Sequence, residues 1–312
     1  MKTMKAVCIY RYGGPEVLTY EDAPCPHPDA GEVLVRVHAA GINPVDWKIR
    51  EGHLKEMLTY TFPLILGWDV SGVVTAVCTG TSRLKVGDEV YSRPDILRDG
   101  AYAEFIVMKE SEVALKPKAI DHLHAAALPL AGLTVWQSLF DAAGLAAGQR
   151  VLIHAAAGGV GHLAVQAAKW KGAHVIGTAS AHNHDFVRQF GADQVVDYNT
   201  ERFTEVVQPV DVVFDTIGGE TQELSWQVLK PGGILVSIAS PPPPEKAQAH
   251  GVRSAFVFTQ PNAAQLAEIA QLVDAEKLKV IVETILPLSD ATRAQELSER
   301  GHGRGKIVLR VV

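Results

Sequence analysis

A glycine-containing turn between residues 151 and 161 carries the strongest chemical signal in the sequence. A short β-prone run, Val151–His154, leads into small residues and then directly into a helical pattern. A dinucleotide pyrophosphate needs this arrangement, because small residues let the backbone approach the phosphates and the N–H groups of a helix N-terminus face the anion. Ala156 stands where the usual G-x-G-x-x-G pattern has its first glycine, while Gly158 and Gly161 hold the second and third positions. The residues of the turn predicted to bind the cofactor are Ala157, Gly158, Gly159, Val160 and Gly161.

The end of the next predicted strand indicates which nucleotide to expect. An enzyme selective for NAD usually carries Asp or Glu about 20 residues beyond the turn, where the carboxylate binds the ribose 2′-hydroxyl. Here the run Ala173–Thr178 leads to Ser180 with no carboxylate, and His182 and His184 follow. Ser180 can donate to a 2′-phosphate and the imidazoles can carry positive charge, so the sequence favours NADP(H). The alternative is that this segment is only a polar helix start with Asn183 as its cap.

Strand and helix patterns alternate around this turn. Strands are predicted at Arg150–His154, Ala173–Thr178, Val195–Val196, Asp211–Phe214 and Gly233–Ile238, and helices at Gly159–Lys171, Asn183–Phe190 and Glu220–Leu229. Strands that alternate with helices form right-handed βαβ units and a mainly parallel sheet. A glycine string alone can be only a tight turn, but inside several βαβ units it favours nucleotide binding.

The parts of the chain on either side have other patterns. Up to about Lys116, β-prone runs alternate with turn formers, which favours a compact barrel-like domain. The strands predicted there are Ala6–Tyr10, Glu32–Ala40, Val70–Cys78, Asp88–Tyr91 and Tyr102–Met108. After Pro241–Pro244 we predict helices at Ala263–Ala275 and Asp290–Arg300 and strands at Val280–Leu286 and Lys306–Val312. We expect an α/β protein with domains at 1–121 and 122–260, and a segment at 261–312 that returns to the first domain.

Length and composition limit the possible classes of protein. A chain of 312 residues is long enough for two domains. No segment approaches the roughly 18 consecutive apolar residues of a membrane helix. The formal charge of -6 offers no basic stripe, so neither nucleic acid nor a membrane is an expected partner. The three cysteines, Cys8, Cys25 and Cys78, are too few for a disulfide framework, and we expect a cytoplasmic protein.

Motifs spread over the whole chain, in the right order, resemble one known family. They are the segments 40–46, 86–90, 101–105, 131–139, 148–154 and 305–309. These segments resemble the zinc-independent medium-chain dehydrogenase/reductase superfamily in its quinone oxidoreductase branch, which includes zeta-crystallin. The resemblance implies a GroES-like β-barrel domain and a Rossmann domain with a doubly wound parallel sheet. It also implies that the nicotinamide lies in a cleft between these domains, and that the protein forms a homodimer.

The resemblance further implies roles for single residues of the cofactor site. Thr134 matches the position that approaches the nicotinamide ribose in that family. Tyr198 matches a tyrosine that lies by the adenosine 2′-phosphate in many members. The other residues implied to border the cofactor are Ile217, Gly218, Ile238, Ala239, Phe256 and Phe258, the last two through backbone groups that face the carboxamide.

Residue types argue against a catalytic zinc. At the three positions where the zinc-dependent branch of the superfamily has its ligands, this sequence has Asn43, Trp68 and Leu130. A catalytic zinc needs three protein ligands, usually His, Cys or carboxylate, so this set does not suffice. The close-spaced cysteines of the structural zinc are absent between Tyr91 and Tyr102. The best histidine pairs, His122 with His124 and His182 with His184, lack a third ligand, so we predict no metal site.

Without zinc, the easier chemistry is hydride delivery onto an acceptor that is already electron-poor, such as a quinone or an α,β-unsaturated carbonyl. Asn43 is the first candidate for polarising the acceptor oxygen or holding the nicotinamide, which it faces in the family. Trp47 is a candidate stacking wall for a planar acceptor, where relatives often have tyrosine. Asp46 and Asp69 could relay a proton, or they could be structural hydrogen-bonding residues. Tyr102 is expected to pack within the barrel, and without a dedicated general acid the solvent can supply the proton.

The sequence therefore predicts an NADPH-dependent, quinone oxidoreductase-like enzyme whose partner is a small-molecule electron acceptor. One alternative keeps the fold and changes the acceptor: an NADPH-dependent enone, enal or 2-enoyl reductase. Another is a catalytically idle NADPH-binding protein, crystallin-like or redox-sensing. A screen of acceptors with NADPH and NADH would distinguish the three.

Overall fold

The computed structural model describes residues 2–301 and 303–312 of the chain, which divides into two compact units. Unit 1 contains residues up to Leu130 together with Gln260–Ala275 and Val280–Val312. Unit 2 contains Ala131–Thr259 and Glu276–Lys279. The chain therefore leaves unit 1 after Leu130, returns to it at Gln260, and leaves it once more for the short stretch Glu276–Lys279.

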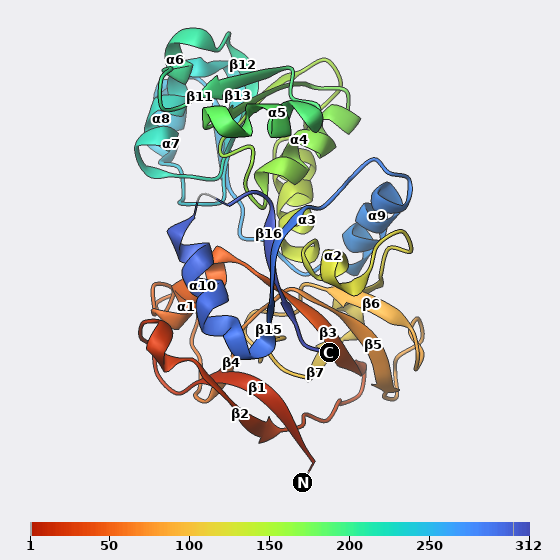
Figure 1. Cartoon of the computed structure of the whole chain (residues 1–312). Coiled ribbons are helices and arrows are strands. Elements are labelled where there is room, and N and C mark those ends of the chain that lie inside the picture. The colour runs from red at the N-terminus through yellow and green to blue at the C-terminus, as the bar shows by residue number, and fades with distance from the viewer. Residues whose placement is uncertain (1, 302) are drawn as a thin grey trace. The chain divides into compact units, whose positions relative to one another are not determined.

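Unit 1 is built from two mainly antiparallel sheets (Figure 1). The smaller sheet has the order β2-β1-β4, from β1 (Thr3–Ile9), β2 (Thr19–Pro24) and β4 (Leu64–Ile65). The larger sheet has the order β15-β16-β3-β5-β6-β8, with β7 also paired to β3. Its strands are β3 (Glu32–Ile42), β5 (Val70–Val77), β6 (Glu89–Ser92), β7 (Phe105–Lys109), β8 (Val113–Leu115), β15 (Val282–Pro287) and β16 (Lys306–Arg310). The predicted barrel-like β domain of the first part thus has its strands close to the predicted positions, although β2, β4 and β8 were not predicted.

Alternating side chains explain why β3 lies in the middle of this sheet. Val33, Val35 and Val37 are all fully buried, while Arg36 between them is exposed. A period of two is the pattern of a strand with one face on the core. Register shifts against β5 occur after Leu34 and after Val37. Such irregularities bend a strand, and β3 is 11 residues long, so it can pair with three neighbours in different parts of its length.

The C-terminal strand joins β3 from the far end of the sequence. β16 pairs antiparallel with β3, with Ile307 opposite Ile42 and Leu309 opposite Ala40, and β15 pairs parallel with β16. Helix α10 (Ala291–Arg300) lies against α1 (Pro44–Arg50), as Figure 1 shows in blue and red-orange. This pairing brings residues near position 306 beside residues near position 43.

Unit 2 contains one six-stranded parallel sheet with the order β11-β10-β9-β12-β13-β14. Its strands are β9 (Arg150–Ile153), β10 (His174–Ala179), β11 (Gln194–Asp197), β12 (Val210–Asp215), β13 (Leu229–Ser237) and β14 (Arg253–Phe256). This is the order of a doubly wound Rossmann sheet, in which the connections change direction between the first and fourth strands, here β9 and β12. The predicted parallel sheet is confirmed, with β14 as an additional strand.

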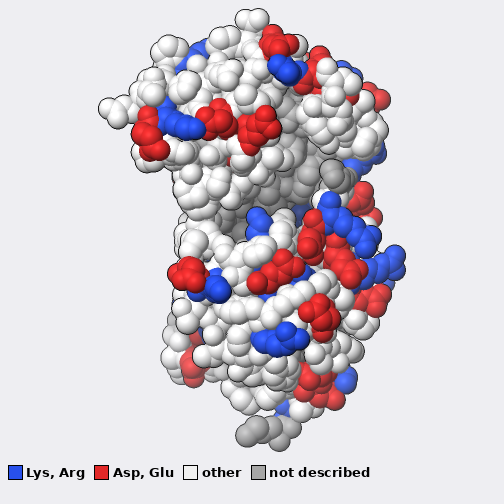
Figure 2. Space-filling view, turned by 90° about the vertical axis from the view of Figure 1, so that its left-hand side faces the viewer, with Lys and Arg blue, Asp and Glu red and all other residues white. Residues whose placement is uncertain are grey.

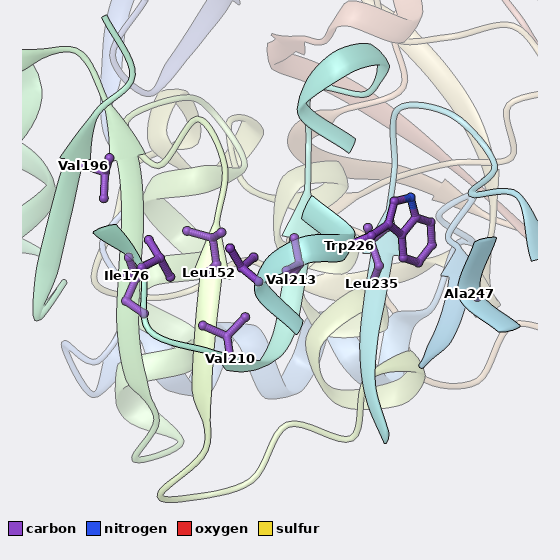
Figure 3. Packing of buried hydrophobic residues seen from close by; sticks show 10 residues of the cluster. Leu152, Ile176, Val196, Val210, Val213, Trp226, Leu235 and Ala247 are labelled. Atoms are coloured by element: carbon purple, nitrogen blue, oxygen red, sulfur yellow. The ribbon is translucent and has the colours of Figure 1, made fainter. Parts of the chain in front are cut away.

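Apolar side chains from these strands form the core of unit 2 (Figure 3). Leu152, Ile176, Val213 and Leu235 come from four neighbouring strands and are fully buried. Trp226, two per cent exposed, packs with them from the helical side of the sheet. Continuous apolar strands of this kind are typical of a parallel sheet that helices cover on both faces.

The helices of the chain have the following bounds. The α-helices not yet given are α2 (His122–Ala126), α3 (Pro129–Val135), α4 (Gly161–Trp170), α5 (His184–Gln189), α6 (Phe203–Val206), α7 (Gly219–Ser225), α8 (Pro244–Ala249) and α9 (Ala263–Asp274). A π-helical stretch covers Trp136–Ala142, and short 3₁₀ turns cover Pro15–Val17, Glu110–Glu112, Ala181–Asn183, Trp226–Val228 and Leu288–Asp290. Among the described residues, no helix is long and apolar enough to cross a membrane.

The boundaries of the units differ from the predicted domain limits of 121 and 260 at two places. Residues 122–130 lie in unit 1, because α2 packs against β3 and β5. Residues 276–279 lie in unit 2, because the Gln166 side chain donates to Lys279 O and accepts from Lys279 N, both at 2.8 Å. A change from strand-like to helix-like sequence therefore does not coincide with the change of unit.

Candidate functional site

The predicted cofactor residues of unit 2 gather at one edge of its sheet. All six strands are parallel, so their carboxyl ends lie along the same edge, which we call the carboxyl edge. The segments that directly follow or end the strands are 155–161 after β9, Ser180 after β10, Tyr198 after β11, Ile217 and Gly218 after β12, Ile238 and Ala239 after β13, and Phe256 and Phe258 at the end of β14. Ligands of doubly wound sheets bind at this edge, where the strand order reverses.

The turn after β9 has the shape that a phosphate cradle requires. Ala155 has a positive φ of 49°, and Gly158 N donates to Ala155 O at 3.0 Å. A Cβ atom on Gly161 would lie 2.1 Å from Ala155 O, so only glycine fits there. α4 begins at Gly161, two residues later than predicted, and its first turn leaves backbone N–H groups that can face an anion. A dinucleotide pyrophosphate therefore fits this turn.

A hydrogen-bond chain through His154 fixes the start of the turn. Thr178 Oγ1 lies 3.2 Å from Ala155 N, which donates to it, and 3.3 Å from His154 Nδ1. On the other side, His154 Nε2 lies 3.0 Å from Ser225 Oγ, which donates to Thr221 O. Burial lowers the pKa of His154 to about 4 against the opposing charge of Asp215, so the imidazole is neutral. No pattern in the sequence indicates a role for this residue.

Asp215, the last residue of β12, holds the next two loops of the carboxyl edge. Its carboxylate is fully buried. Oδ1 accepts from the backbone N–H groups of Ile217 at 3.0 Å and Gly218 at 2.8 Å. Oδ2 accepts from Ser237 Oγ at 2.8 Å and from Gln222 Nε2 at 3.0 Å. One side chain thus shapes both loops that the family resemblance placed beside the cofactor, and sequence analysis missed it.

Residues predicted to choose the nucleotide lie at the ends of β10 and β11. Ser180 is buried and Asn183 Nδ2 donates to its Oγ at 3.2 Å, while His182 and Tyr198 are exposed. Asn183 stands at the N-cap position of α5, as the alternative interpretation expected, although its side chain makes no capping hydrogen bond there. The parallel register also sets the carboxylate residue Asp197 opposite Ala179, one residue before Ser180. The rule that looks for a carboxylate about 20 residues beyond the glycine turn does not indicate Asp197, which lies further along the chain.

Thr134 and Thr259 meet at the same edge. Their hydroxyl oxygens are 2.7 Å apart, and the two residues are four and seven per cent exposed. Thr259 follows the β14 segment, in which Val257 N continues the pairing by donating to Ser237 O at 2.9 Å. Phe256 is 37 per cent exposed. The segment from Phe256 to Thr259 therefore presents both apolar side chains and backbone groups at this edge.

In unit 1, the predicted catalytic residues Asn43 and Asp46 belong to a buried polar cluster. We call Asn43, Asp46, Asp69, Tyr102 and Lys306 the Asn43 network. Asn43 is four per cent exposed; its Nδ2 donates to Asp69 Oδ2 at 2.8 Å, and its Oδ1 accepts from Lys306 Nζ. Asp69 Oδ1 accepts from Leu130 N at 2.6 Å. Burial raises the pKa of Asp69, while the nearby Lys306 ammonium opposes the shift.

Asp46 holds the backbone at the same place. It is fully buried, and its Oδ2 accepts from Asn43 N at 2.8 Å and from Tyr102 Oη at 2.7 Å. These bonds begin α1, with Asn43 as N-cap and Pro44 as the first helical residue. Burial raises the pKa of Asp46 to about 7, against the opposing effect of its two hydrogen bonds. Tyr102 is fully buried, as predicted.

Trp47 lies next to the Asn43 network on α1 and is half-buried. Its ring meets His53 edge-on with centroids 5.9 Å apart, and Lys48 Nζ lies 5.6 Å from the ring centroid. None of these contacts tests the expected stacking of Trp47 on an acceptor, so that role stays a prediction.

The three positions considered for zinc carry other interactions. The fully buried Trp68 donates from Nε1 to Arg98 O at 3.0 Å, and Leu130 uses its backbone N–H on Asp69. The Lys306 ammonium bonds Asn43 at the first position and would repel a cation there. Among the described residues, no group of three or more His, Cys, Asp or Glu side chains could hold a metal ion. Catalytic zinc does not fit this donor set.

Two family models match the chain, one within unit 1 and one that runs from unit 2 into the last part of unit 1. Residues 29–118 match the alcohol dehydrogenase GroES-like domain, and residues 190–309 match a family model described as zinc-binding dehydrogenase. The human protein named NAD(P)H oxidoreductase RTN4IP1, mitochondrial, is 35% identical and covers 99% of this chain and 89% of its own length. The Arabidopsis thaliana chloroplast envelope quinone oxidoreductase homolog is 35% identical, with 99% and 98% covered.

The chain belongs to the medium-chain dehydrogenase/reductase superfamily, in its quinone oxidoreductase branch. Two solved structures agree with this. The quinone oxidoreductase from Coxiella burnetii has a TM-score of 0.92 at 38% identity, with both chains fully covered. The Escherichia coli quinone oxidoreductase complexed with NADPH has a TM-score of 0.89 at 30% identity, with 98% of this chain and 100% of that chain covered.

The comparisons confirm the predicted family, the GroES-like and Rossmann fold and an oxidoreductase that uses a nicotinamide cofactor. Several relatives carry mitochondrial or chloroplast in their names, so the cytoplasmic location stays a prediction. The homodimer and the absence of nucleic-acid and membrane partners stay predictions too. On the face of Figure 2, Lys and Arg side chains are interspersed with Asp and Glu.

Proposed function

We propose that this oxidoreductase transfers hydride from NADPH to a quinone or a similar conjugated carbonyl acceptor without a catalytic zinc. The observation that carries the proposal is the donor set of unit 1. Where zinc-dependent relatives have ligands, this chain has an amide, an indole and an alkyl side chain, and a buried ammonium bonds the amide. The family model named for zinc binding covers residues 190–309, which contain none of these three positions.

Each residue would have a defined task in this reaction. The turn at 157–161 would hold the pyrophosphate, and the loops shaped by Asp215 would border the rest of the cofactor. When bound, the reduced nicotinamide supplies the hydride. The amide of Asn43 would donate to the acceptor oxygen as negative charge develops there, and Trp47 would stack on a planar acceptor. The acceptor delocalises the incoming charge itself, so a Lewis acid is not needed.

The choice of NADPH rests on the end of β10. Ser180, which has no acidic side chain of its own, stands where NAD-selective enzymes have a carboxylate, and a serine hydroxyl can donate to a 2′-phosphate. Exposed His182 and Tyr198 lie at the same end of the sheet and can add contacts. The Asp197 carboxylate opposes this preference, so we expect it to be moderate.

The test is oxidation of NADPH and NADH with a panel of quinones and a panel of enones and enals, with and without a strong chelator. We expect quinone-dependent oxidation of NADPH, no loss with chelator and no stoichiometric zinc by elemental analysis. Faster turnover of the enones would indicate an enone or 2-enoyl reductase instead. Oxidation no faster than background with every acceptor would indicate an idle NADPH-binding protein. Stoichiometric zinc coupled to loss of activity on chelation would overturn the proposal.

A further inference from the structure

We propose that Lys306 and Asp69 are positioning residues that fix the side-chain amide of Asn43, so that it offers an N–H group to the acceptor and not its carbonyl oxygen. This inference rests on the proposed function, because it specifies which end of the Asn43 amide does the work there. Neither Lys306 nor the orientation of the amide follows from the sequence around residue 43.

Lys306 reaches Asn43 through strand pairing. It is the first residue of β16, and the pairing of Ile307 with Ile42 sets it beside the end of β3. The side chain is four per cent exposed, and Nζ donates to Ile42 O at 3.1 Å, to Asn43 Oδ1 and to Asp69 Oδ2 at 3.4 Å. An ammonium has three N–H donors, and all three have an acceptor here.

Asp69 completes the arrangement from the other side. Its side chain is fully buried, so a carboxylate there needs several donors. Leu130 N supplies one to Oδ1, while Asn43 Nδ2 and Lys306 Nζ supply two to Oδ2. The backbone of Asp69 is also held, because Gly41 N donates to its carbonyl oxygen at 3.0 Å. Both charged partners of Asn43 are therefore fixed in place.

The two charges allow only one orientation of the amide. With Oδ1 on the ammonium and Nδ2 on the carboxylate, both contacts are charge-assisted hydrogen bonds. A flipped amide would set its NH₂ group against the Lys306 ammonium and its oxygen against the Asp69 carboxylate, so both bonds would become repulsive. Nδ2 carries two hydrogens and Asp69 accepts one, which leaves the second as the donor that Asn43 can offer.

A donor, and not an acceptor, is what the proposed reaction needs. Hydride arriving at a quinone or enone carbon sends negative charge to the acceptor oxygen, and a fixed N–H stabilises that charge without reorganising during the reaction. An amide free to flip would spend part of its time with the oxygen facing the acceptor, which repels the same charge. Lys306 and Asp69 would thus act on the acceptor only through Asn43.

A double-mutant cycle tests this dependence directly. The variants are Lys306→Met, which removes the ammonium, Asn43→Ala, and the two combined. If Lys306 acts through Asn43, Lys306→Met should lower the acceptor kcat/KM about tenfold, and the double variant should be no slower than Asn43→Ala alone. The dissociation constant of NADPH should stay within about threefold in all three. Effects of the two changes that multiply, or an unchanged kcat/KM in Lys306→Met, would overturn the inference.

Two further variants separate positioning from stability. Tyr91→Phe removes another buried hydrogen bond of unit 1, from Tyr91 Oη to Leu266 O, away from the Asn43 network, and should lower the melting temperature without changing kcat/KM. If Lys306→Met does not fold, Asp69→Asn takes its place in the cycle, because it keeps the shape and removes the charge that selects the amide orientation.

A wild-type enzyme that oxidises no NADPH with any acceptor would overturn the proposed function along with the inference. An active wild type whose variants multiply would overturn the inference alone.

Discussion

The carboxyl edge of unit 2 and the Asn43 network of unit 1 are built in opposite ways. The edge presents mainly backbone: turns after parallel strands, where small residues and helix N-termini are the essential features. The Asn43 network consists of five almost completely buried side chains, from residue 43 to residue 306, held together by hydrogen bonds among an amide, two acidic groups, a phenol and an ammonium. A backbone site tolerates many side chains but few changes of shape, whereas a charged network tolerates little change of charge.

The largest expected effect concerns the charge inside the Asn43 network. Asp46 has a pKa raised to about 7, so the folded protein holds a proton that the unfolded chain releases near the ordinary value of 3.8. A raised carboxyl pKa stabilises the fold at low pH, and this contribution is lost as pH rises towards 7, by an amount on the order of 4 kcal/mol. The melting temperature of the wild type should therefore fall more steeply between pH 4 and 8 than that of Asp46→Asn.

Asp69, Lys306 and Tyr102 also face Asp46, but they are present in both proteins, so the difference between the two curves isolates Asp46. Parallel curves would show that Asp46 is ionised throughout this range. In that case the Asn43 network carries one more negative charge than it does with Asp46 protonated.

For the carboxyl edge, the largest effect should come from a change of shape. Gly161→Ala puts a Cβ 2.1 Å from Ala155 O, so the turn must move. We expect the dissociation constant of NADPH to rise about a hundredfold, the equivalent of one or two lost hydrogen bonds to phosphate. Gly172→Ala, just beyond the other end of α4, is the control: its positive φ of 85° makes it costly to stability but not to binding. Equal losses of affinity in both would mean that only folding is affected.

Asn43→Ala tests the side-chain site in the matching way. Loss of one preorganised donor costs about 10²–10³ in kcat in a well-studied site, and we expect less here, about tenfold to a hundredfold in acceptor kcat/KM, because the acceptor spreads its own charge. The dissociation constant of NADPH should stay within about threefold. Steady-state kinetics and a melting curve on the same preparation distinguish the roles: an unstable but fully active variant would reduce Asn43 to a scaffold residue.

These two sites also differ in how far the sequence could predict them. The turn at 157–161 and Ser180 could be predicted because each follows a recognisable strand, and a parallel sheet brings such segments to one edge. The residues that follow the other strands were named through the family resemblance, and β14 was not predicted at all. Lys306 could not be, because it meets Asn43 only through the register of β16 on β3, which no local pattern indicates. The helix α1 was missed although Asn43-Pro44 is a typical helix start, because seven residues give too short a periodicity. Asp215 was not singled out, since its four hydrogen bonds come from a loop, a helix and the end of another strand, which no local pattern brings together.

Asp215→Asn lies between the two kinds of site, because the Asp215 side chain fixes the backbone of one loop directly and that of a second loop through Ser237. An amide cannot accept at both ends, so the donors on Oδ1 or those on Oδ2 must lose their acceptor. We expect the dissociation constant of NADPH to rise about tenfold, equivalent to the loss of one hydrogen bond to a charged group. Asp211→Asn is the matched control on the same strand, because Asp211 lies at the opposite end of β12, where it bonds Arg150 N and Lys230. If both variants weaken binding alike, the effect belongs to the sheet and not to the loops.

The smallest expected effect concerns the choice between NADPH and NADH. Asp197 ends β11 opposite Ala179, so its carboxylate lies near the place proposed for the 2′-phosphate, although its Oδ1 already accepts from Asn199 at 3.1 Å. Asp197→Asn should raise the ratio of the NADH to the NADPH dissociation constant about threefold, because the carboxylate is already engaged by Asn199 and a single charge pair near the protein surface contributes little. Asp193→Asn, before the start of the same strand, should leave the ratio unchanged.

Binding of both cofactors is measured by fluorescence titration at constant ionic strength, since added salt would screen the effect. An unchanged ratio would mean that the carboxylate serves only its own turn. Weaker binding of NADH with NADPH unaffected would instead make Asp197 a ligand of the ribose hydroxyl, and the preference for NADPH would have to come from Ser180, His182 and Tyr198 alone.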